Sequence, residues 1–467
     1  MTALMSLATH HDVTWIASAM SDVDREIAAE SDGAVEDVLP NGAEYRLRFL
    51  AHDPAAYEGY YNVVANPTLW FVQHCLWELV NVPDHEQSGL IEAWRNGYTP
   101  INAAFAKAAL EELARKPEAV VFFNDYHLYL APRLVRTSAP EASLLHFVHI
   151  PWPQPACWRV LPEEISAGVH DGLLANDVVG FHTSRWRRNF IQSAQSVLGA
   201  ERVPGEAAVS HAGAKTCLSA RGISIDPREL AELAGDPRVA EHERRIEETR
   251  PELLVVRVDR TDPSKNIVRG FRAYELFLEL HPELHGRVSM LSCLDPSRLD
   301  ISEYEDYLEA IQREARRVNE RFQQQGWLPI DLQIADDVYQ SFAAYKQYDA
   351  FFVNAISDGL NLVAKEAPLV NEREGVLILS ENTGAHEELG SFSLTIDPLD
   401  IRAQADAIYE ALTLPAEVRG RWIEGIRSWV GEHDLAWWIN GLLRDLDDCV
   451  ESKGGAGATP PAPGHGG

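Results

Sequence analysis

The stretch from Asp349 to Glu372 constrains the fold more than any other part of this chain. It begins with an apolar, aromatic run of strand length, D-A-F-F-V-N-A, and continues with the polar loop I-S-D-G-L-N. Gly359 stands where the backbone must turn sharply, and Asn361 is a candidate N-cap for a helix that opens at Leu362. A strand that passes through a tight loop into a helix directs free N–H groups toward the carboxyl edge of a sheet. Open α/β sheets bind anions and nucleotides at that edge.

Two carboxylates, Asp358 and Glu366, lie on either side of this turn. One could hold a neutral, hydroxylated ligand from the loop and the other from the first helical turns. The alternative is an ordinary strand-to-helix connection whose carboxylates are only solvated. This stretch alone favours neither interpretation.

The length and charge of the chain narrow the class of protein. A chain of 467 residues is too long for one ordinary core, so we expect two domains. The formal net charge is −30, which argues against nucleic acid or an anionic membrane as a partner. A local basic pocket could still bind a small anionic substrate.

The cysteines and the apolar segments bear on the cellular compartment. No C-x-x-C pair occurs, so we expect no disulfide framework and a reducing cytoplasm. No segment approaches the roughly 20 apolar residues of a membrane span, so we expect a soluble, intracellular protein. The five cysteines are Cys75, Cys157, Cys217, Cys293 and Cys449.

Two sets of strand-like runs alternate with helical sequence, which is typical of parallel sheets. Before the first set, we expect the end of a helix at 1–11, strands at Val13–Ala19 and Glu44–Leu50, and pairs of helices over 57–115 whose aromatic residues form core. The runs of the first set are 119–124, 144–150 and 177–181. The runs of the second set are Leu253–Asp259, Arg287–Cys293, Ile330–Ile334, Asp349–Ala355, Gly375–Ser380 and Phe392–Ile396.

The strands of the first set end at polar side chains that would line one crevice. These side chains are Asn124, Asp125, His127, His149 and His182. A hinge is expected near Ile225 to Pro227 and a long, charged helix over Ser302–Phe322. The glycine- and proline-rich tail should be disordered.

A second candidate site is V-D-R-T-D-P-S-K-N, residues 258–266, in which Arg260 and Lys265 bracket a loop at a strand end. Two cations beside a helix N-terminus suit a diphosphate. A surface cluster of salt bridges with Asp259 and Asp262 is the alternative. Arg298, at the end of the next strand, is a weaker candidate phosphate ligand.

We find no metal-ligand spacing in the sequence, because His386-Glu387-Glu388 lacks the second histidine of a zinc helix. No serine or cysteine nucleophile motif is present either. Arg260 and Lys265 would therefore do what a divalent cation does elsewhere. His149 in H-I-P-W-P and Asp125 in N-D-Y-H would, taken alone, each fit a structural role as well.

Together these segments resemble the trehalose-6-phosphate synthases of glycosyltransferase family 20, from about residue 13 to 445. The most specific match is S-D-G-L-N-L-V-A-K-E, residues 357–366. The other matched stretches are Y-Y-N-V-V-A-N-P-T-L-W (60–70), N-D-Y-H-L (124–128), H-I-P-W-P (149–153), D-V-V-G-F-H-T (177–183), V-D-R-T-D-P-S-K (258–265) and V-L-I-L-S-E-N-T-G-A (376–385).

The resemblance implies an α/β, GT-B architecture in which two Rossmann-like domains face a central cleft. The implied domains are an acceptor-binding domain at 1–225, a nucleotide-sugar-binding domain at 226–430, a helix crossing back at 431–450 and a disordered tail at 451–467. It also implies metal-independent transfer of glucose, with retention, from a nucleotide sugar to glucose 6-phosphate. No cofactor is implied.

The resemblance assigns a role to each candidate residue. On the donor side, Arg260 and Lys265 hold the diphosphate, Glu366 holds the ribose, and Asp358 and His149 hold hydroxyls of the sugar. Backbone N–H groups of Asn361, Leu362 and Val363 assist with the phosphates. On the acceptor side stand Tyr61, Trp70, Asp125 and Arg298, with Tyr61 and Arg298 near the phosphate.

Several positions depart from the family pattern. Asn124 replaces a usual histidine, Ser357 a usual basic residue, and Ser18 the second tryptophan of an early W-x-G-W stretch. The stretches W-I-A-S-A (15–19), F-V-H-I-P-W-P (147–153) and E-A-P-L-V-N-E-R (366–373) are also similar to the validoxylamine-phosphate synthases, pseudoglycosyltransferases that couple cyclitols. The run L-V-A-K-E, however, keeps the sugar-transferring form of the donor motif.

We therefore expect a cytoplasmic α,α-trehalose-phosphate synthase that uses UDP-glucose and glucose 6-phosphate. Self-association into a homo-oligomer is a further hypothesis. The alternatives are a validoxylamine-phosphate synthase-like enzyme, a glucosylglycerol-phosphate synthase and a sugar-phosphate sensor without turnover. The family's opening strand and glycine-rich loop have no counterpart before Val13. This predicts either a start codon placed downstream of the true one or a shortened protein with a weakened acceptor site.

Overall fold

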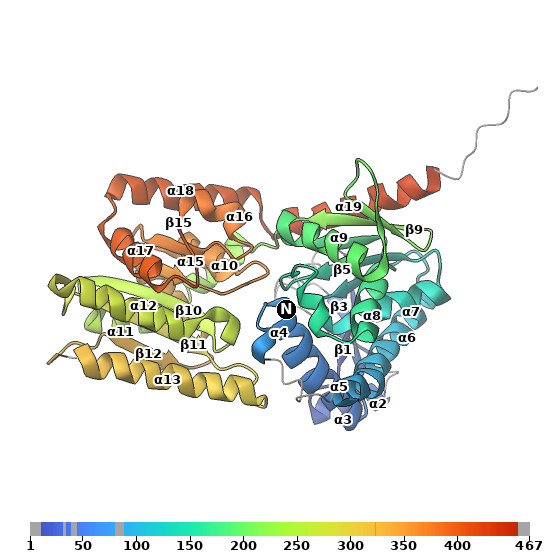
Figure 1. Ribbon diagram of the computed structural model, residues 1–467, viewed down its shortest axis with the longest axis horizontal. Coiled ribbons are helices and arrows are strands. Elements are labelled where there is room, and N and C mark those ends of the chain that lie inside the picture. Colours follow the sequence, from blue (N-terminus) through green and yellow to red (C-terminus); the bar gives the residue numbers. More distant parts are fainter. Residues whose placement is uncertain (1–10, 31–33, 39–43, 80–87, 323, 456–467) are drawn as a thin grey trace, which may run out of the picture. The chain divides into compact units, whose positions relative to one another are not determined.

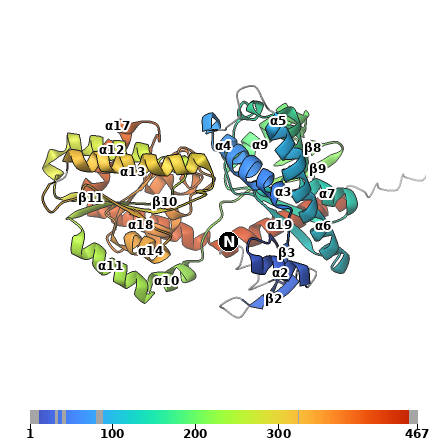
Figure 2. The ribbon, with the colours of Figure 1, turned by 90° about the horizontal axis from the view of Figure 1, so that it is seen from below.

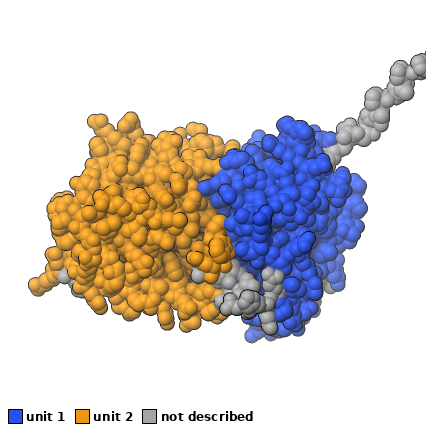
Figure 3. Space-filling view, viewed as in Figure 1, with its two compact units in different colours: residues 1–72, 81–221, 439–467 blue, residues 73–80, 222–438 orange. Residues whose placement is uncertain are grey.

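The computed structural model has an α/β architecture, as the alternation of strand and helix patterns predicts (Figure 1). It describes residues 11–30, 34–38, 44–79, 88–322 and 324–455. The helix end expected at 1–11 and most of the tail at 451–467 therefore fall outside the described residues. The chain divides into two compact units (Figure 3). Unit 1 comprises residues 1–72, 81–221 and 439–467, and unit 2 comprises residues 73–80 and 222–438.

Unit 2 is built on a six-stranded sheet in which every pair of neighbouring strands is parallel. All six strands of the second predicted set are present. Such a sheet is covered on both faces, so its strands are largely apolar, with polar exceptions such as Arg257, Asp259 and Asp331. In order across the sheet, the strands are β12 (Ile330–Ile334), β11 (Val288–Asp295), β10 (Leu253–Arg260), β13 (Ala350–Val353), β14 (Val376–Ser380) and β15 (Leu394–Ile396).

Helices cover both faces of this sheet (Figure 2). On one face lie α12 (Ile267–Leu280), α13 (Ser302–Phe322) and α17 (Ile401–Thr413). The predicted charged helix is α13, and its bounds are those expected. The other face carries α10 (Pro227–Ala234), α11 (Pro237–Thr249), α14 (Val338–Gln347), α15 (Val363–Val370) and α18 (Ala416–Glu432). Phe271, Tyr274 and Phe277 of α12 are fully buried in the core of unit 2.

Unit 1 contains a second six-stranded sheet, with three strands that the sequence did not reveal. The predicted strands are β4 (Val120–Asn124), β5 (Ser143–Val148) and β6 (Val178–Phe181). The sheet continues through the parallel β9 (Ala214–Ala220) to the antiparallel β8 (Ala208–His211) and β7 (Glu201–Arg202). Sequence periodicity predicts no strand in this region, because these segments are short and carry little apolar alternation.

A separate three-stranded sheet precedes this one in the chain. It pairs the predicted strands β1 (Thr14–Ser18) and β3 (Glu44–Leu50) in parallel and adds β2 (Ala34–Val38) on the other side of β3. The first six-stranded sheet is flanked by α7 (Ala131–Ser138), α8 (Glu163–Leu173), α9 (Ser184–Leu198) and α19 (Leu435–Gly455).

The described parts of region 57–115 are mostly helical, as predicted, but much of this helix is wound as π-helix. The aromatic residues are mostly core, with Tyr60 at 4% exposure and Phe71 at 0%. Trp77 is a correction to that prediction, because 54% of it is exposed. The segments are α3 (Pro54–Glu58), η2 (Gly59–Leu69), α4 (Trp70–Gln73), η3 (Trp77–Leu79), α5 (Ser88–Ala93), η4 (Trp94–Tyr98) and α6 (Thr99–Arg115).

A disulfide joins Cys217 of β9 to Cys449 of α19, so the expectation that the cysteines stay unpaired was wrong. The two residues are 232 positions apart in the sequence, but their Cα atoms lie 6.3 Å apart. Spacing rules miss this pair because the packing of α19 against the sheet brings it together. Beside the disulfide, Arg221 donates to both carboxylate oxygens of Asp445 on α19, at 3.0 and 2.8 Å. The helix is therefore held to unit 1 by a covalent bond and an ion pair.

Candidate functional site

The predicted donor loop connects β13 to α15 at the carboxyl edge of the unit 2 sheet. Its sharp turn falls at Asn361, whose φ of 81° lies in the left-handed region that asparagine tolerates better than most residues. Asn361 does not cap α15, which corrects the sequence interpretation. Leu362 occupies the cap position, and the Asn361 amide instead donates to Asp358 Oδ2 at 3.0 Å.

The first amides of α15 are available to a ligand. Among the described residues, the N–H groups of Leu362 and Val363 make no hydrogen bond, whereas the next amides, from Ala364 onward, bond within the turn. The N-terminal amides of a helix attract anions, because they lack partners within the helix and carry the positive end of its dipole. These are two of the amides that the sequence assigned to the donor phosphates.

Lys265 and Asp358 form an ion pair at this edge of the sheet, across 93 positions of sequence. Both side chains are largely buried, at 13% and 14% exposure. Burial acts to raise the pKa of Asp358, but the Lys265 ammonium and the Asn361 amide outweigh it and hold that pKa below its usual value. Asp358 is therefore an anion at neutral pH, aligned by two donors.

Two more predicted residues surround Asp262 in the neighbouring loop. Arg260 ends β10, and its guanidinium and that of Arg298 lower the pKa of the buried Asp262 to about 2, despite the opposing effect of burial. Arg298 has a left-handed φ of 51° and donates to the Tyr304 hydroxyl at 2.6 Å. These two positive charges thus act on Asp262 from the ends of β10 and β11.

Glu366 lies in the first turn of α15, and the hydroxyl of Tyr345 on α14 donates to its Oε2 at 3.2 Å. Burial raises the pKa of Glu366, and the Tyr345 hydroxyl opposes that rise. A carboxylate held in this way can accept from a ligand hydroxyl with its remaining lone pairs.

In unit 1 the structure brings His149, Asn124 and Asp125 together at the ends of β4 and β5. Asp125 Oδ1 accepts from the His149 backbone amide at 3.0 Å, and His149 Nε2 lies 3.2 Å from Asn124 Oδ1. Burial lowers the pKa of His149, so its imidazole is neutral at pH 7. Asn124, a departure from the family pattern, is therefore a direct neighbour of a predicted site residue.

The two aromatic candidates of unit 1 lie in a cluster of rings. Tyr61 stacks on His127 with ring centroids 5.9 Å apart, and Trp70 meets Tyr126 at 5.6 Å. Trp70 is nearly buried, at 6% exposure, whereas Tyr61 is half-buried. Of these two, Tyr61 has more surface to offer a ligand.

Sequence reasoning missed residues that shape the donor site. Tyr345 orients Glu366, and the Tyr307 hydroxyl accepts from Ile267 N at 2.7 Å, at the first amide of α12. Asn266, with a left-handed φ of 58°, donates to the Asn354 and Pro398 carbonyls at 2.9 and 2.8 Å. Asn266 was within the quoted motif, and an asparagine directly before a helix is a signal that could have identified it.

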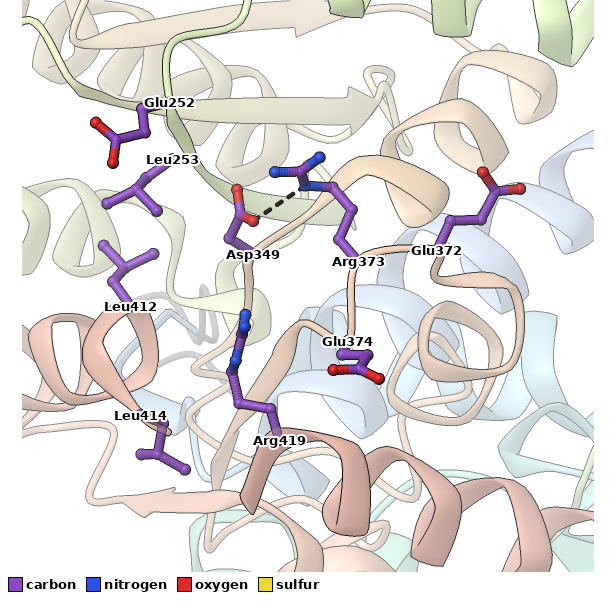
Figure 4. A pocket seen from close by; sticks show the side chains of 9 residues that line it. All are labelled: Glu252, Leu253, Asp349, Glu372, Arg373, Glu374, Leu412, Leu414 and Arg419. Carbon is purple, nitrogen blue, oxygen red and sulfur yellow. Dashed lines mark hydrogen bonds and ion pairs between the residues drawn. The ribbon is translucent and has the colours of Figure 1, made fainter. Parts of the chain in front are cut away.

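A cavity of about 600 Å³ lies at the opposite, amino edge of the unit 2 sheet and holds none of the predicted site residues (Figure 4). There Asp349 accepts from Arg250 at 2.6 Å, from Arg373 at 3.0 Å and from the Leu254 amide at 2.8 Å. Asp349, the first residue of the stretch 349–372 that contains the donor loop, thus has a structural role. The lining residues are Glu252, Leu253, Asp349, Glu372, Arg373, Glu374, Leu412, Leu414 and Arg419.

In the part of the chain that the structure describes, no helix combines the length and apolarity needed to span a bilayer. The same residues contain no group of three or more histidine, cysteine or acidic side chains that could hold a metal ion.

The fold and the donor edge define a class: glycosyltransferases of GT-B architecture. An E. coli structure described as trehalose-6-phosphate bound with UDP-2-fluoro glucose superposes with a TM-score of 0.83 at 24% identity, covering 95% of each chain. A Burkholderia xenovorans α,α-trehalose-phosphate synthase (UDP-forming), in complex with glucose-6-phosphate, gives a TM-score of 0.80 at 25% identity and covers 93% of this chain and 100% of that one.

The glycosyltransferase family 20 model matches residues 1–448, and the chain belongs to that family. It is an enzyme of the hexosyltransferase class. The chain is also 33% identical to the validamine 7-phosphate valienyltransferase of Streptomyces hygroscopicus subsp. jinggangensis, over 93% of this chain and 86% of that protein.

Proposed function

We propose that the chain transfers glucose from UDP-glucose to glucose 6-phosphate, with retention, to give α,α-trehalose 6-phosphate. The observation that carries this proposal is the donor edge of unit 2. The Lys265–Asp358 pair and the two available amides of α15 belong to the same edge of one sheet. The ligands named for the E. coli and Burkholderia structures support a nucleotide-sugar donor and a sugar-phosphate acceptor.

The proposed chemistry follows from where charge develops. As the bond from the sugar to the diphosphate breaks, negative charge grows on the leaving group and the sugar becomes oxocarbenium-like. Arg260, Lys265 and the amides of Leu362 and Val363 would stabilise that negative charge. Asp358 would orient a sugar hydroxyl. Retention would follow from attack on the face that the diphosphate leaves, with a leaving-group oxygen accepting the proton of the acceptor hydroxyl.

The proposal also covers the residues that bind the acceptor and the cellular location of the protein. His149 would hold the donor sugar, and Tyr61, Trp70, Asp125 and Arg298 the acceptor. We also propose a cytoplasmic location and self-association, which cell fractionation and size-exclusion chromatography test. The boundaries expected for the acceptor, donor and crossing segments remain predictions.

A donor and acceptor panel tests the function. Purified protein is incubated with UDP-, ADP- or GDP-glucose and glucose 6-phosphate, and mass spectrometry and NMR identify any phosphorylated disaccharide and its anomeric configuration. A Lys265→Ala variant is the negative control, and a Lys346→Ala variant is the matched positive control, because Lys346 pairs with Glu243 and Glu372 instead. Glycerol 3-phosphate is tested as an alternative acceptor in the same assay. Product that forms with glycerol 3-phosphate but not with glucose 6-phosphate would contradict the proposed acceptor.

A second candidate function is valienyl transfer to validamine 7-phosphate. It is favoured by the Streptomyces relative and by Ser18, which replaces a tryptophan of the family pattern and whose hydroxyl lies 3.1 Å from His52 Nε2. Adding a nucleotide-linked valienyl donor together with validamine 7-phosphate to the panel distinguishes the two functions. Transfer to that acceptor in preference to glucose 6-phosphate would favour the second.

A further inference from the structure

Lys365 is a fully buried lysine that the proposed chemistry does not use. It lies in the first turn of α15, one residue before Glu366, and its side chain has 0% exposure. Its Nζ lies 2.6 Å from Glu388 Oε2 and donates to the Ile223 carbonyl at 2.9 Å. Burying an ammonium is costly unless charge and hydrogen bonds compensate. A lysine retained here at such a cost needs an explanation.

The Ile223 carbonyl, one of the two partners of Lys365, belongs to a segment that connects the two units. Ile223 is the second residue of unit 2 after the chain leaves unit 1 at Arg221. Two residues further on, the Ile225 carbonyl accepts from the amide of Leu435 at 3.1 Å, close to the point where the chain leaves unit 2 after Trp438. Lys365 therefore holds one of the segments that connect the units. That segment is in turn hydrogen-bonded to another connecting segment through Ile225 and Leu435.

Glu388 belongs to α16 (His386–Leu389), which follows a loop packed on the donor loop. Gly384 N donates to the Asp358 carbonyl at 3.0 Å, and Ala385 N donates to the Leu360 carbonyl at 2.8 Å. The approach is close, because a Cβ on Gly384 would lie 2.0 Å from the Gly359 oxygen. The donor loop and the helix that carries Glu388 are thus one hydrogen-bonded block.

The connecting segment also fits closely against Glu388. A Cβ on Gly222 would lie 2.1 Å from Glu388 Oε1, so any larger residue here would require the Glu388 carboxylate to move. Gly222, Ile223, Lys365 and Glu388 thus form a continuous set of contacts. It runs from the connecting segment to the donor loop, entirely within unit 2.

We propose that Lys365, acting through Glu388, is a positioning residue that couples occupancy of the donor loop to the connecting segment 222–225. This inference rests on the proposed function, because it assumes that the donor loop binds a nucleotide sugar. Lys365 touches no substrate in this scheme. Its role is to transmit the order that a ligand imposes on residues 358–363 to the segment at which the two units join.

The test measures hydrogen exchange of the amides at 222–225, with and without UDP, in the wild type and in a Lys365→Met/Glu388→Gln variant. The double substitution removes both buried charges together, so that neither remains unpaired. We expect UDP to slow exchange at 222–225 in the wild type. In the variant UDP still binds by calorimetry, but the slowing is lost and kcat falls about tenfold or more.

A Lys346→Met/Glu243→Gln variant is the matched control, because that pair is 2.7 Å apart and largely buried in the same unit, at 16% and 13% exposure. It should keep both the UDP response and kcat. Wild-type protein that binds UDP without slower exchange at 222–225 would overturn the coupling alone, as would a Lys365 variant that responds like the wild type. Wild-type protein that does not bind UDP would overturn the proposed function as well.

Discussion

The pairing of Lys265 with Asp358 makes a quantitative prediction about catalysis. Replacing either residue by alanine should cost about 2–4 kcal/mol of transition-state stabilisation, because each is a preorganised charged group at the donor edge. The two losses should not add. In the Lys265→Ala variant, Asp358 has already lost the cation that aligns it. Replacing Asp358 in that variant should therefore cost less than replacing it in the wild type.

The size of this coupling follows from the burial of the pair. At an effective dielectric constant of about 20, two unit charges in contact attract by about 4 kcal/mol, and desolvation cancels part of that gain. The side chains are only 13% and 14% exposed, so screening by solvent is weak. We therefore expect a coupling energy of about 1–3 kcal/mol, which means that the double variant is about 5- to 150-fold more active than additivity predicts.

The assay is a double-mutant cycle on kcat/KM, using the wild type, Lys265→Ala, Asp358→Ala and the double variant. Circular dichroism and urea unfolding check that each variant is folded, because Lys265→Ala removes the cation that pairs with the buried Asp358 carboxylate. A parallel cycle of Lys346→Ala with Asp358→Ala should be additive, since Lys346 pairs elsewhere. Additivity within about 0.5 kcal/mol in the Lys265 cycle would refute the coupling.

Three further predictions concern stability and metal. Cys449→Ser should lower the free energy of unfolding by about 3–5 kcal/mol, because the Cys217–Cys449 bond closes a loop of up to 232 residues; alkylation of both cysteines without reductant would contradict the bond. Burial lowers the pKa of His146 to about 3 and that of His170 to about 4, so both are neutral when folded and take up protons on unfolding. Their contribution to stability should be complete above about pH 6.5 and be lost as pH falls toward 4. Urea titrations should show the free energy of unfolding falling by up to about 3 kcal/mol per pH unit in this range, and His170→Gln should make that dependence weaker. Transfer should continue in EDTA, and an absolute requirement for an added divalent cation would contradict the roles of the cationic side chains.

The features of this protein that depend on local pattern could be predicted from its residues. Apolar runs separated by helical periods predicted all six strands of the unit 2 sheet, because strand and helix periodicities are properties of neighbouring residues. The same locality placed Arg260, Lys265 and Asp358 at strand ends. Parallel strands must present those ends at one edge, so these residues could be assigned to one site without knowing the order of the strands.

Only the tertiary structure decided which distant residues meet. The ion pair of Lys265 with Asp358 exists because β10 lies beside β13 in the sheet, an order that no local pattern encodes. The Cys217–Cys449 bond depends in the same way on α19 packing against β9. Local periodicity says which face of an element is apolar, whereas the choice of partner is made by the packing of the whole unit.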